Sequence, residues 1–135
     1  MKKILTQVYS LEIPDNWLFE SDDSGIVSMH DHKGRGALTI SSYSSSSDSP
    51  DAVAMLERFV GGRGLVVRKE GKPSAAESEY EDSVGGKTVF VYAAAFCRGH
   101  QLILVSYNCN KDKLSKSELE QVHKAVEGLE FKDSK

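Results

Sequence analysis

The stretch KTVFVYAAAFCRGHQLILVSYNC, residues 87–109, decides the fold. It contains two apolar runs, residues 87–97 and 101–109, with only Arg-Gly-His between them. Two apolar runs joined by a short glycine-containing connection are typical of a β-hairpin. We therefore expect a long antiparallel hairpin, around which the rest of the chain builds its sheet.

The two cysteines of the chain lie in this hairpin, one in each strand. Folding the hairpin about Gly99 places Cys109 opposite residue 89 or 90, far along the ladder from Cys97. At about 3.3 Å per residue, the separation exceeds roughly 20 Å. A disulfide allows a Cα separation of only about 4.4–6.8 Å. The spacing therefore predicts two free thiols, which suits a reducing compartment.

Further strands are indicated by alternation and by flanking turn residues. In residues 7–13, QVYSLEI, apolar Tyr9, Leu11 and Ile13 alternate with polar residues, as in a half-buried strand. Trp17 and Phe19, after the turn PDN, are expected as core or rim aromatics. The other predicted strands are GIVSMH (25–30), GALTISSY (36–43), LVVRK (65–69) and AESEYEDS (76–83).

Two helices are predicted between and after these strands. The first starts with Ser49 as N-cap, Pro50 at its first position and Asp51 in its first turn. Its expected apolar stripe consists of Ala52, Val53, Leu56, Phe59 and Val60. The second helix starts at a capping box of Ser115 and Glu118 and buries Leu119, Val122 and Val126. The expected fold class is α+β: an antiparallel sheet of about six to seven strands flanked by two helices.

Length and charge restrict the class of protein. A chain of 135 residues, 39% hydrophobic and 27% charged, fits one globular domain, residues 1–135. The net charge of −3 argues against a nucleic-acid clamp, which needs a basic surface. The start MKKILTQ lacks the long apolar segment of a signal peptide, and no apolar run reaches 18 residues. We therefore expect a cytoplasmic protein that binds no membrane.

The segment MHDHKGRGALTI, residues 29–40, resembles a metal or phosphate site at first sight. His30 and His32 would share one face of a strand, but a zinc site needs at least three protein ligands and no third is evident. Phosphate-binding glycine loops lead from a strand into a helix, whereas GRG at 34–36 opens a strand and GGRG at 61–64 follows a helix. We predict an exposed turn with no metal and no cofactor.

The acidic segment ESEYEDS is the strongest candidate for a binding surface. In an extended strand Glu77, Glu79 and Glu81 share one face, and Asp82 is expected beside them. Such a face can protect a sheet edge or dock a basic partner. Since the chain has no Gly-x-Ser-x-Gly elbow and no evident catalytic set, we predict that it is not an enzyme.

The opening YSLEIPDNW, residues 9–17, resembles the start of the PsbP-like superfamily, in which an alternating strand ends at a proline and a tryptophan follows. The later hairpin and the C-terminal helix ending in GLEF agree with that resemblance. It implies a sandwich built on an antiparallel sheet, and it implies no shared chemistry. Members of the superfamily bind partners: a photosystem II extrinsic subunit, a nuclear-import factor for the Ran GTPase and chaperones of type VI secretion effectors.

The first functional hypothesis is a non-catalytic, cytosolic, bacterial protein-interaction module of the adaptor, effector-chaperone or toxin-immunity type. Its expected contact residues are the four acidic residues together with His30 and Arg35. The alternative is a small-molecule carrier with a pocket between sheet and helix, near Trp17, Tyr92 and Tyr107. A metal-dependent enzyme centred on His30 and His32 is the third hypothesis.

Overall fold

The computed structural model describes residues 2–31, 36–44, 51–67 and 74–132. The elements in chain order are β1 (Lys2–Leu5), β2 (Tyr9–Ile13), β3 (Trp17–Ser21), β4 (Val27–Asp31), β5 (Gly36–Ser44), α1 (Ala52–Val60), β6 (Leu65–Val67), β7 (Ser74–Val84), β8 (Lys87–Arg98), β9 (Gln101–Asn110), the 3₁₀ turn η1 (Lys111–Lys113), α2 (Lys116–Glu127) and β10 (Glu130–Phe131).

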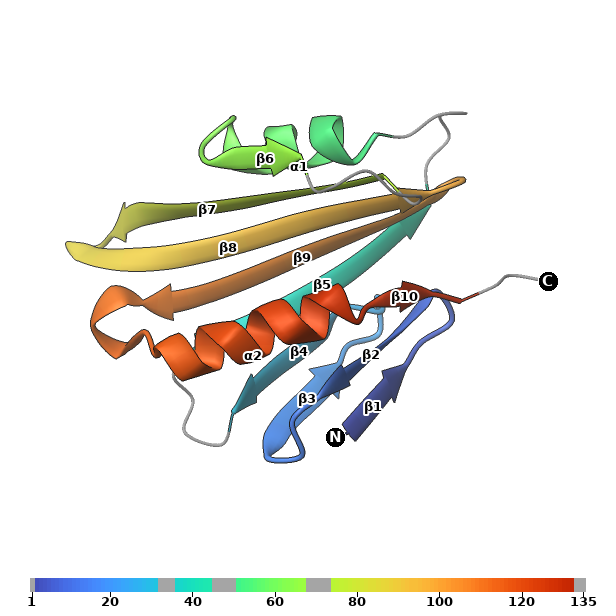
Figure 1. The fold of residues 1–135 in the computed structure, drawn as a ribbon, viewed down its shortest axis with the longest axis horizontal. Coiled ribbons are helices and arrows are strands. Elements are labelled where there is room, and N and C mark those ends of the chain that lie inside the picture. The colour runs from blue at the N-terminus through green and yellow to red at the C-terminus, as the bar shows by residue number, and fades with distance from the viewer. Residues whose placement is uncertain (1, 32–35, 45–50, 68–73, 133–135) are drawn as a thin grey trace.

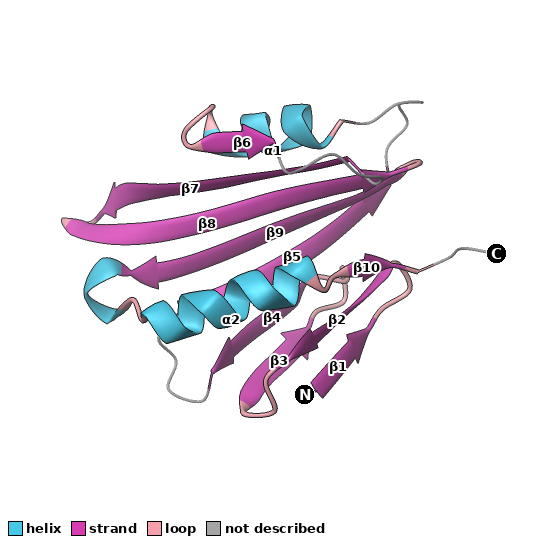
Figure 2. Ribbon diagram, in the orientation of Figure 1, coloured by secondary structure: helices cyan, strands magenta, loops and turns pink. Residues whose placement is uncertain are grey.

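The strands form two antiparallel sheets (Figures 1 and 2). The larger sheet has seven strands in the order β3-β4-β5-β9-β8-β7-β6, and the smaller has three in the order β1-β2-β10. The predicted α+β class, with an antiparallel sheet of six to seven strands and two helices, is therefore confirmed. The separate three-stranded sheet was not predicted.

The predicted hairpin is the pair β8–β9, in the middle of the larger sheet. Gly99, in the turn, has a φ of +59°, a left-handed conformation that favours glycine. Cys109 lies opposite Phe90, and Cys97 lies opposite Leu102 at the other end of the ladder. Both cysteines are buried and free, as the spacing predicts.

Strand β8 is buried on both faces, because its alternate residues pack into different clusters. Tyr92, Ala94 and Phe96 face the main core, which fills the space between the larger sheet, the smaller sheet and α2. Ala93, Ala95 and Cys97 face α1 on the opposite side of the larger sheet. The two helices therefore cover opposite faces of this sheet (Figure 1).

The alternation predicted for residues 7–13 is confirmed in β2. Tyr9, Leu11 and Ile13 are at most 1% exposed, and they pack in the main core with Trp17. Phe19, expected as a core or rim aromatic, is 46% exposed. Residue 19 lies near the free edge of the larger sheet, where few neighbours can cover a side chain.

Helix α1 begins later than the sequence predicts. Asp51 is its N-cap, and its Oδ1 accepts a hydrogen bond of 3.0 Å from the backbone N–H of Val53. The predicted cap Ser49 and Pro50 lie outside the described residues. Phe59 was predicted to join the buried stripe, but it is 45% exposed because the helix buries Ala52, Leu56 and Val60 instead.

Helix α2 begins as predicted. The hydroxyl of Ser115 accepts a hydrogen bond of 3.2 Å from the backbone N–H of Glu118, and Val122 and Val126 are buried. The carboxylate of Glu118 lies inside the protein, where it accepts a hydrogen bond from the hydroxyl of Tyr107. The first turn of α2 is therefore fixed to the larger sheet as well as capped.

Three short strands were missed: β1, β3 and β10, of four, five and two residues. None of them shows the alternation of apolar and polar residues that indicates a half-buried strand. Among the described helices, none combines the length and the apolar character needed to span a membrane.

Candidate functional site

The four acidic residues predicted as a docking surface all lie on β7, but on two faces. Glu77, Glu79 and Glu81 alternate along the strand and share the face that carries α2. Asp82 points to the opposite face, where its carboxylate lies 3.5 Å from the guanidinium of Arg63. The expectation that Asp82 stands beside the glutamates is wrong, because consecutive strand residues point to opposite faces.

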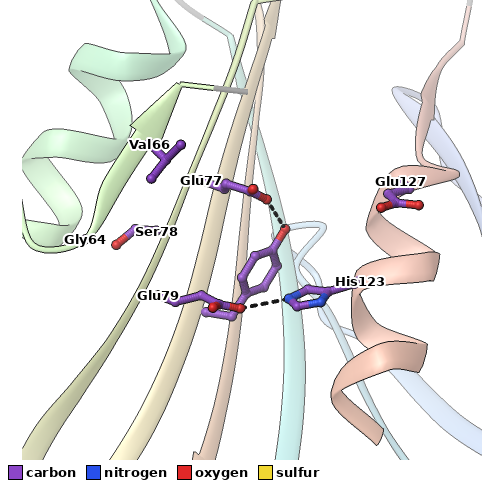
Figure 3. A pocket seen from close by; sticks show the side chains of 8 residues that line it. Gly64, Val66, Glu77, Ser78, Glu79, His123 and Glu127 are labelled. Carbon is purple, nitrogen blue, oxygen red and sulfur yellow. Dashed lines mark hydrogen bonds and ion pairs between the residues drawn. The ribbon is translucent and has the colours of Figure 1, made fainter. Parts of the chain in front are cut away.

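Two of the glutamates have side-chain partners from other elements (Figure 3). The hydroxyl of Tyr92, on β8, donates a hydrogen bond of 3.1 Å to Glu77. The Nε2 atom of His123, on α2, lies 2.9 Å from the carboxylate of Glu79. The rings of Tyr92 and His123 meet edge to face, with centroids 4.8 Å apart. Helix α2 is thus joined to β7 and β8 by one small polar network.

The third glutamate lies beyond this network. Glu81 forms an ion pair of 2.8 Å with the ammonium group of Lys111 in η1, and both side chains are about half exposed. Exposed pairs of this kind contribute about 0–1 kcal/mol to stability. Glu81 therefore belongs to the solvent-exposed surface next to the site.

The network lines a groove between β7 and α2, hereafter the β7–α2 groove (Figure 3). Its volume is about 440 Å³. Its walls include a valine, a tyrosine, a histidine and three carboxylates: Val66, Tyr92, His123, Glu77, Glu79 and Glu127. The chain can pass so close to β7 because residue 64 is glycine. A Cβ at Gly64 would overlap the carbonyl oxygen of Glu79.

The electrostatic character of the groove is acidic. Three glutamates line it, and among the described residues that line it none is a lysine or an arginine. An ionised carboxylate offers about four acceptor positions, so each glutamate of the groove can accept hydrogen bonds from several donors at once. Within the described residues, no cluster of three or more His, Cys, Asp or Glu is arranged to hold a metal ion. The groove suits a positively charged group that can donate hydrogen bonds.

The histidine segment lies elsewhere. His30 is on β4, where it alternates with the core residue Met29, so its side chain lies on the face of the larger sheet away from α2. There it lines a shallow hollow of about 400 Å³ with Ala37 and Asn108. His32 and Arg35 lie outside the described residues. The structure therefore does not bring His30 to the glutamates.

The three aromatic residues predicted to line a pocket are separated too. Tyr92 lines the β7–α2 groove, whereas Trp17 and Tyr107 are each 1% exposed in the main core. Burial, with the hydrogen bond from Tyr107 to Glu118, raises the pKa of the Tyr107 hydroxyl. A pocket between sheet and helix exists, but Trp17 and Tyr107 are not among its lining residues.

His123 and Glu127 were not predicted as site residues. They are four positions apart on α2, so they share one face of the helix, and this spacing was the available signal. Their approach to β7 depends on the packing of α2 over the sheet, which the sequence does not show.

Comparison with known proteins identifies the fold. The sequence matches no family model and no curated protein. A structure from Bacteroides thetaiotaomicron matches with a TM-score of 0.76 and 17% identity, over 98% of this chain and 49% of that one. The cyanobacterial PsbP protein CyanoP of Synechocystis matches with a TM-score of 0.66 and 13% identity, over 92% and 86% of the two chains. The chain has the PsbP-like fold.

A third structure extends the PsbP-like comparison. LpqN of Mycobacterium tuberculosis, described as involved in cell envelope biogenesis, matches with a TM-score of 0.59 and 15% identity, over 93% and 83% of the chains. The chain spans about half the length of the Bacteroides protein. At these identities the matches show a shared fold, and the fold by itself specifies no function. The resemblance seen in YSLEIPDNW is confirmed at the level of the fold.

Proposed function

We propose that this chain is a non-catalytic protein-interaction module, of the adaptor, effector-chaperone or immunity type, which docks a basic segment of a partner protein in the β7–α2 groove. The observation that carries the proposal is the groove itself. It joins a volume of about 440 Å³ to three carboxylates, and no lysine or arginine of the described part of the chain lines it. Lysine and arginine side chains of a partner complement such a surface in charge.

The internal contacts of the groove favour binding rather than oppose it. Tyr92 and His123 hold Glu77 and Glu79 in fixed positions, so less side-chain entropy is lost when a partner binds. Glu127, on α2, lies across the groove from β7 (Figure 3). A cation that enters the groove would therefore meet carboxylates from both walls.

The test is purification of the tagged protein from its native cells, followed by charge reversal in the groove. Glu79→Lys with Glu127→Lys places two positive charges where the partner's cations would sit. Like charges in contact cost several kcal/mol, so the affinity should fall about a hundredfold. The matched control reverses exposed Glu12 and Glu57, which lie on β2 and α1 away from the groove.

A stoichiometric partner that is lost with the groove variant and kept with the control variant would support the proposal. Equal binding by both variants, with thermal unfolding showing both folded, would refute it.

A second candidate is a small-molecule carrier that uses the same groove. The specific observation is the volume, which falls within the range of about 300–1,000 Å³ typical of small-molecule sites, together with the aromatic wall of Tyr92. Val66→Trp should fill the groove, whereas Val84→Trp is a matched change at another exposed valine. A compound seen by native mass spectrometry with the wild type and Val84→Trp, but not with Val66→Trp, would favour this candidate.

A further inference from the structure

The larger sheet ends in a three-residue strand at one edge and a five-residue strand at the other. At the first edge β6 is the last strand, and the guanidinium of Arg63, just before β6, lies 4.2 Å from the ring centroid of Tyr80 in β7. At the other edge, β3 is the last strand, and none of the described residues forms a strand on its outer side. Unprotected sheet edges can pair with a strand from another chain.

The alternation of hydrogen-bonded and non-hydrogen-bonded pairs between β3 and β4 shows which backbone groups of β3 point outward. The backbone N–H of Asp22 donates a hydrogen bond of 3.0 Å to the carbonyl of Ile26, which makes these residues a hydrogen-bonded pair at the end of the β3–β4 hairpin. Hydrogen-bonded and non-hydrogen-bonded pairs alternate in an antiparallel ladder. The N–H and C=O groups of Trp17, Phe19 and Ser21 therefore point away from β4.

The outward backbone groups of Trp17 already have hydrogen-bond partners within the chain. The ammonium group of Lys2 donates a hydrogen bond of 2.6 Å to the carbonyl of Trp17, and the N–H of Trp17 donates to Pro14. For Phe19 and Ser21, none of the described residues forms a hydrogen bond with the outward backbone N–H and C=O groups. They present alternating donors and acceptors to an incoming strand.

The side chains of β3 define the chemistry of that strand. Leu18 and Phe19 are 53% and 46% exposed and point to opposite faces of the sheet. Exposed Glu20 shares the face of Leu18, whereas the Lys2 ammonium lies 5.7 Å from the Phe19 ring on the other face. The exposed side chains of this edge are therefore apolar at Leu18 and Phe19 and negatively charged at Glu20.

We propose that β3 accepts an extended segment of a partner protein as an additional antiparallel strand of the larger sheet. The segment carries a lysine or arginine opposite Glu20 and apolar residues opposite Phe19 and Leu18. Its backbone forms hydrogen bonds with the backbone of Phe19 and Ser21, and its cationic side chain forms an ion pair with the carboxylate of Glu20. This is recognition by strand addition, in which the backbone supplies affinity and the side chains supply specificity. The surface is separate from the β7–α2 groove, so each proposal can fail alone.

The test uses a blocked synthetic peptide, Thr-Thr-Lys-Val-Val-Thr, whose lysine would lie opposite Glu20 and whose first valine would lie opposite Phe19. Methylating the backbone nitrogen of this valine removes a hydrogen bond to β3. Methylating the lysine nitrogen leaves the β3 bonds intact, because that nitrogen points away from the protein. In NMR experiments, the unmodified and lysine-methylated peptides should slow exchange of the Phe19 and Ser21 amide hydrogens, and the valine-methylated peptide should not.

Two protein variants sharpen the test. Ser21→Pro removes an outward N–H without removing a bond to β4, and it should abolish peptide binding while the fold is kept. Glu20→Gln should weaken binding about two- to fivefold, as expected for one exposed charge pair, whereas Glu12→Gln should not. No binding at millimolar peptide, or equal binding by the two methylated peptides, would overturn the proposal.

Discussion

Replacing Gly36 by alanine should destabilise the protein through one buried ring. A Cβ at residue 36 would lie 2.6 Å from the hydroxyl oxygen of Tyr107 and 2.8 Å from two of its ring carbons. Tyr107 is 1% exposed, and its hydroxyl donates a hydrogen bond to the buried Glu118. The added Cβ would therefore press on a ring that is both buried and hydrogen-bonded.

The expected loss combines two effects. Overpacking in a well-packed core costs about 1–3 kcal/mol. Loss of a partner for a buried polar group costs about 1–3 kcal/mol. Since a shift of the Tyr107 ring relieves part of the overlap, we expect Gly36→Ala to lower the free energy of unfolding by about 2–4 kcal/mol.

Urea unfolding followed by the fluorescence of buried Trp17 measures this change. With a slope of about 2 kcal/mol per molar urea, the midpoint should fall by about 1–2 M. Gly128→Ala is the matched control, because its Cβ would meet no atom closer than 3.6 Å. If Gly36→Ala and Gly128→Ala unfold within about 0.5 kcal/mol of each other, the steric reasoning is refuted.

Three further predictions concern single side chains. Ser115→Ala removes the cap of α2 and should cost about 1 kcal/mol in urea unfolding; an unchanged midpoint would contradict it. Burial raises the pKa of Tyr9 from 10.0 to about 12, so stability should fall between these pH values, and less steeply in Tyr9→Phe. Burial, then the charge of Asp51, raises the pKa of Cys97 to about 11, so a thiol reagent should label it quickly only after unfolding.

Much of the fold was readable because several elements repeat an apolar pattern. Tyr9, Leu11 and Ile13 mark the buried face of β2, and the apolar runs around Gly99 mark the central hairpin. Strands β1 and β3 were missed because KKIL and WLFES show no alternation of apolar and polar residues. Phe59 was misassigned because the apolar stripe of a helix shows only roughly which side is buried. Helix α1 packs on the alanines of β7 and β8, and this contact does not extend to Phe59.

The site was predicted less completely. Strand alternation correctly put Glu77, Glu79 and Glu81 on one face, since that depends on β7 alone. Their partners come from β8, α2 and η1, and nothing in the sequence states which distant elements meet. The groove depends on how α2 lies over the sheet, a tertiary property that local patterns do not encode.

The strand order has a consequence for synthesis on the ribosome. Strand β5 pairs with β9, while α1, β6, β7 and β8 lie between them in the chain. The meander β3–β4–β5 therefore leaves the ribosome before its neighbour in the sheet exists, and the part of its apolar face that β1 and β2 do not cover stays exposed until β9 and α2 have joined it. Nascent chains in this interval expose aggregation-prone surface, which chaperones can cover. Pausing of translation before residue 101 should therefore lengthen the vulnerable interval.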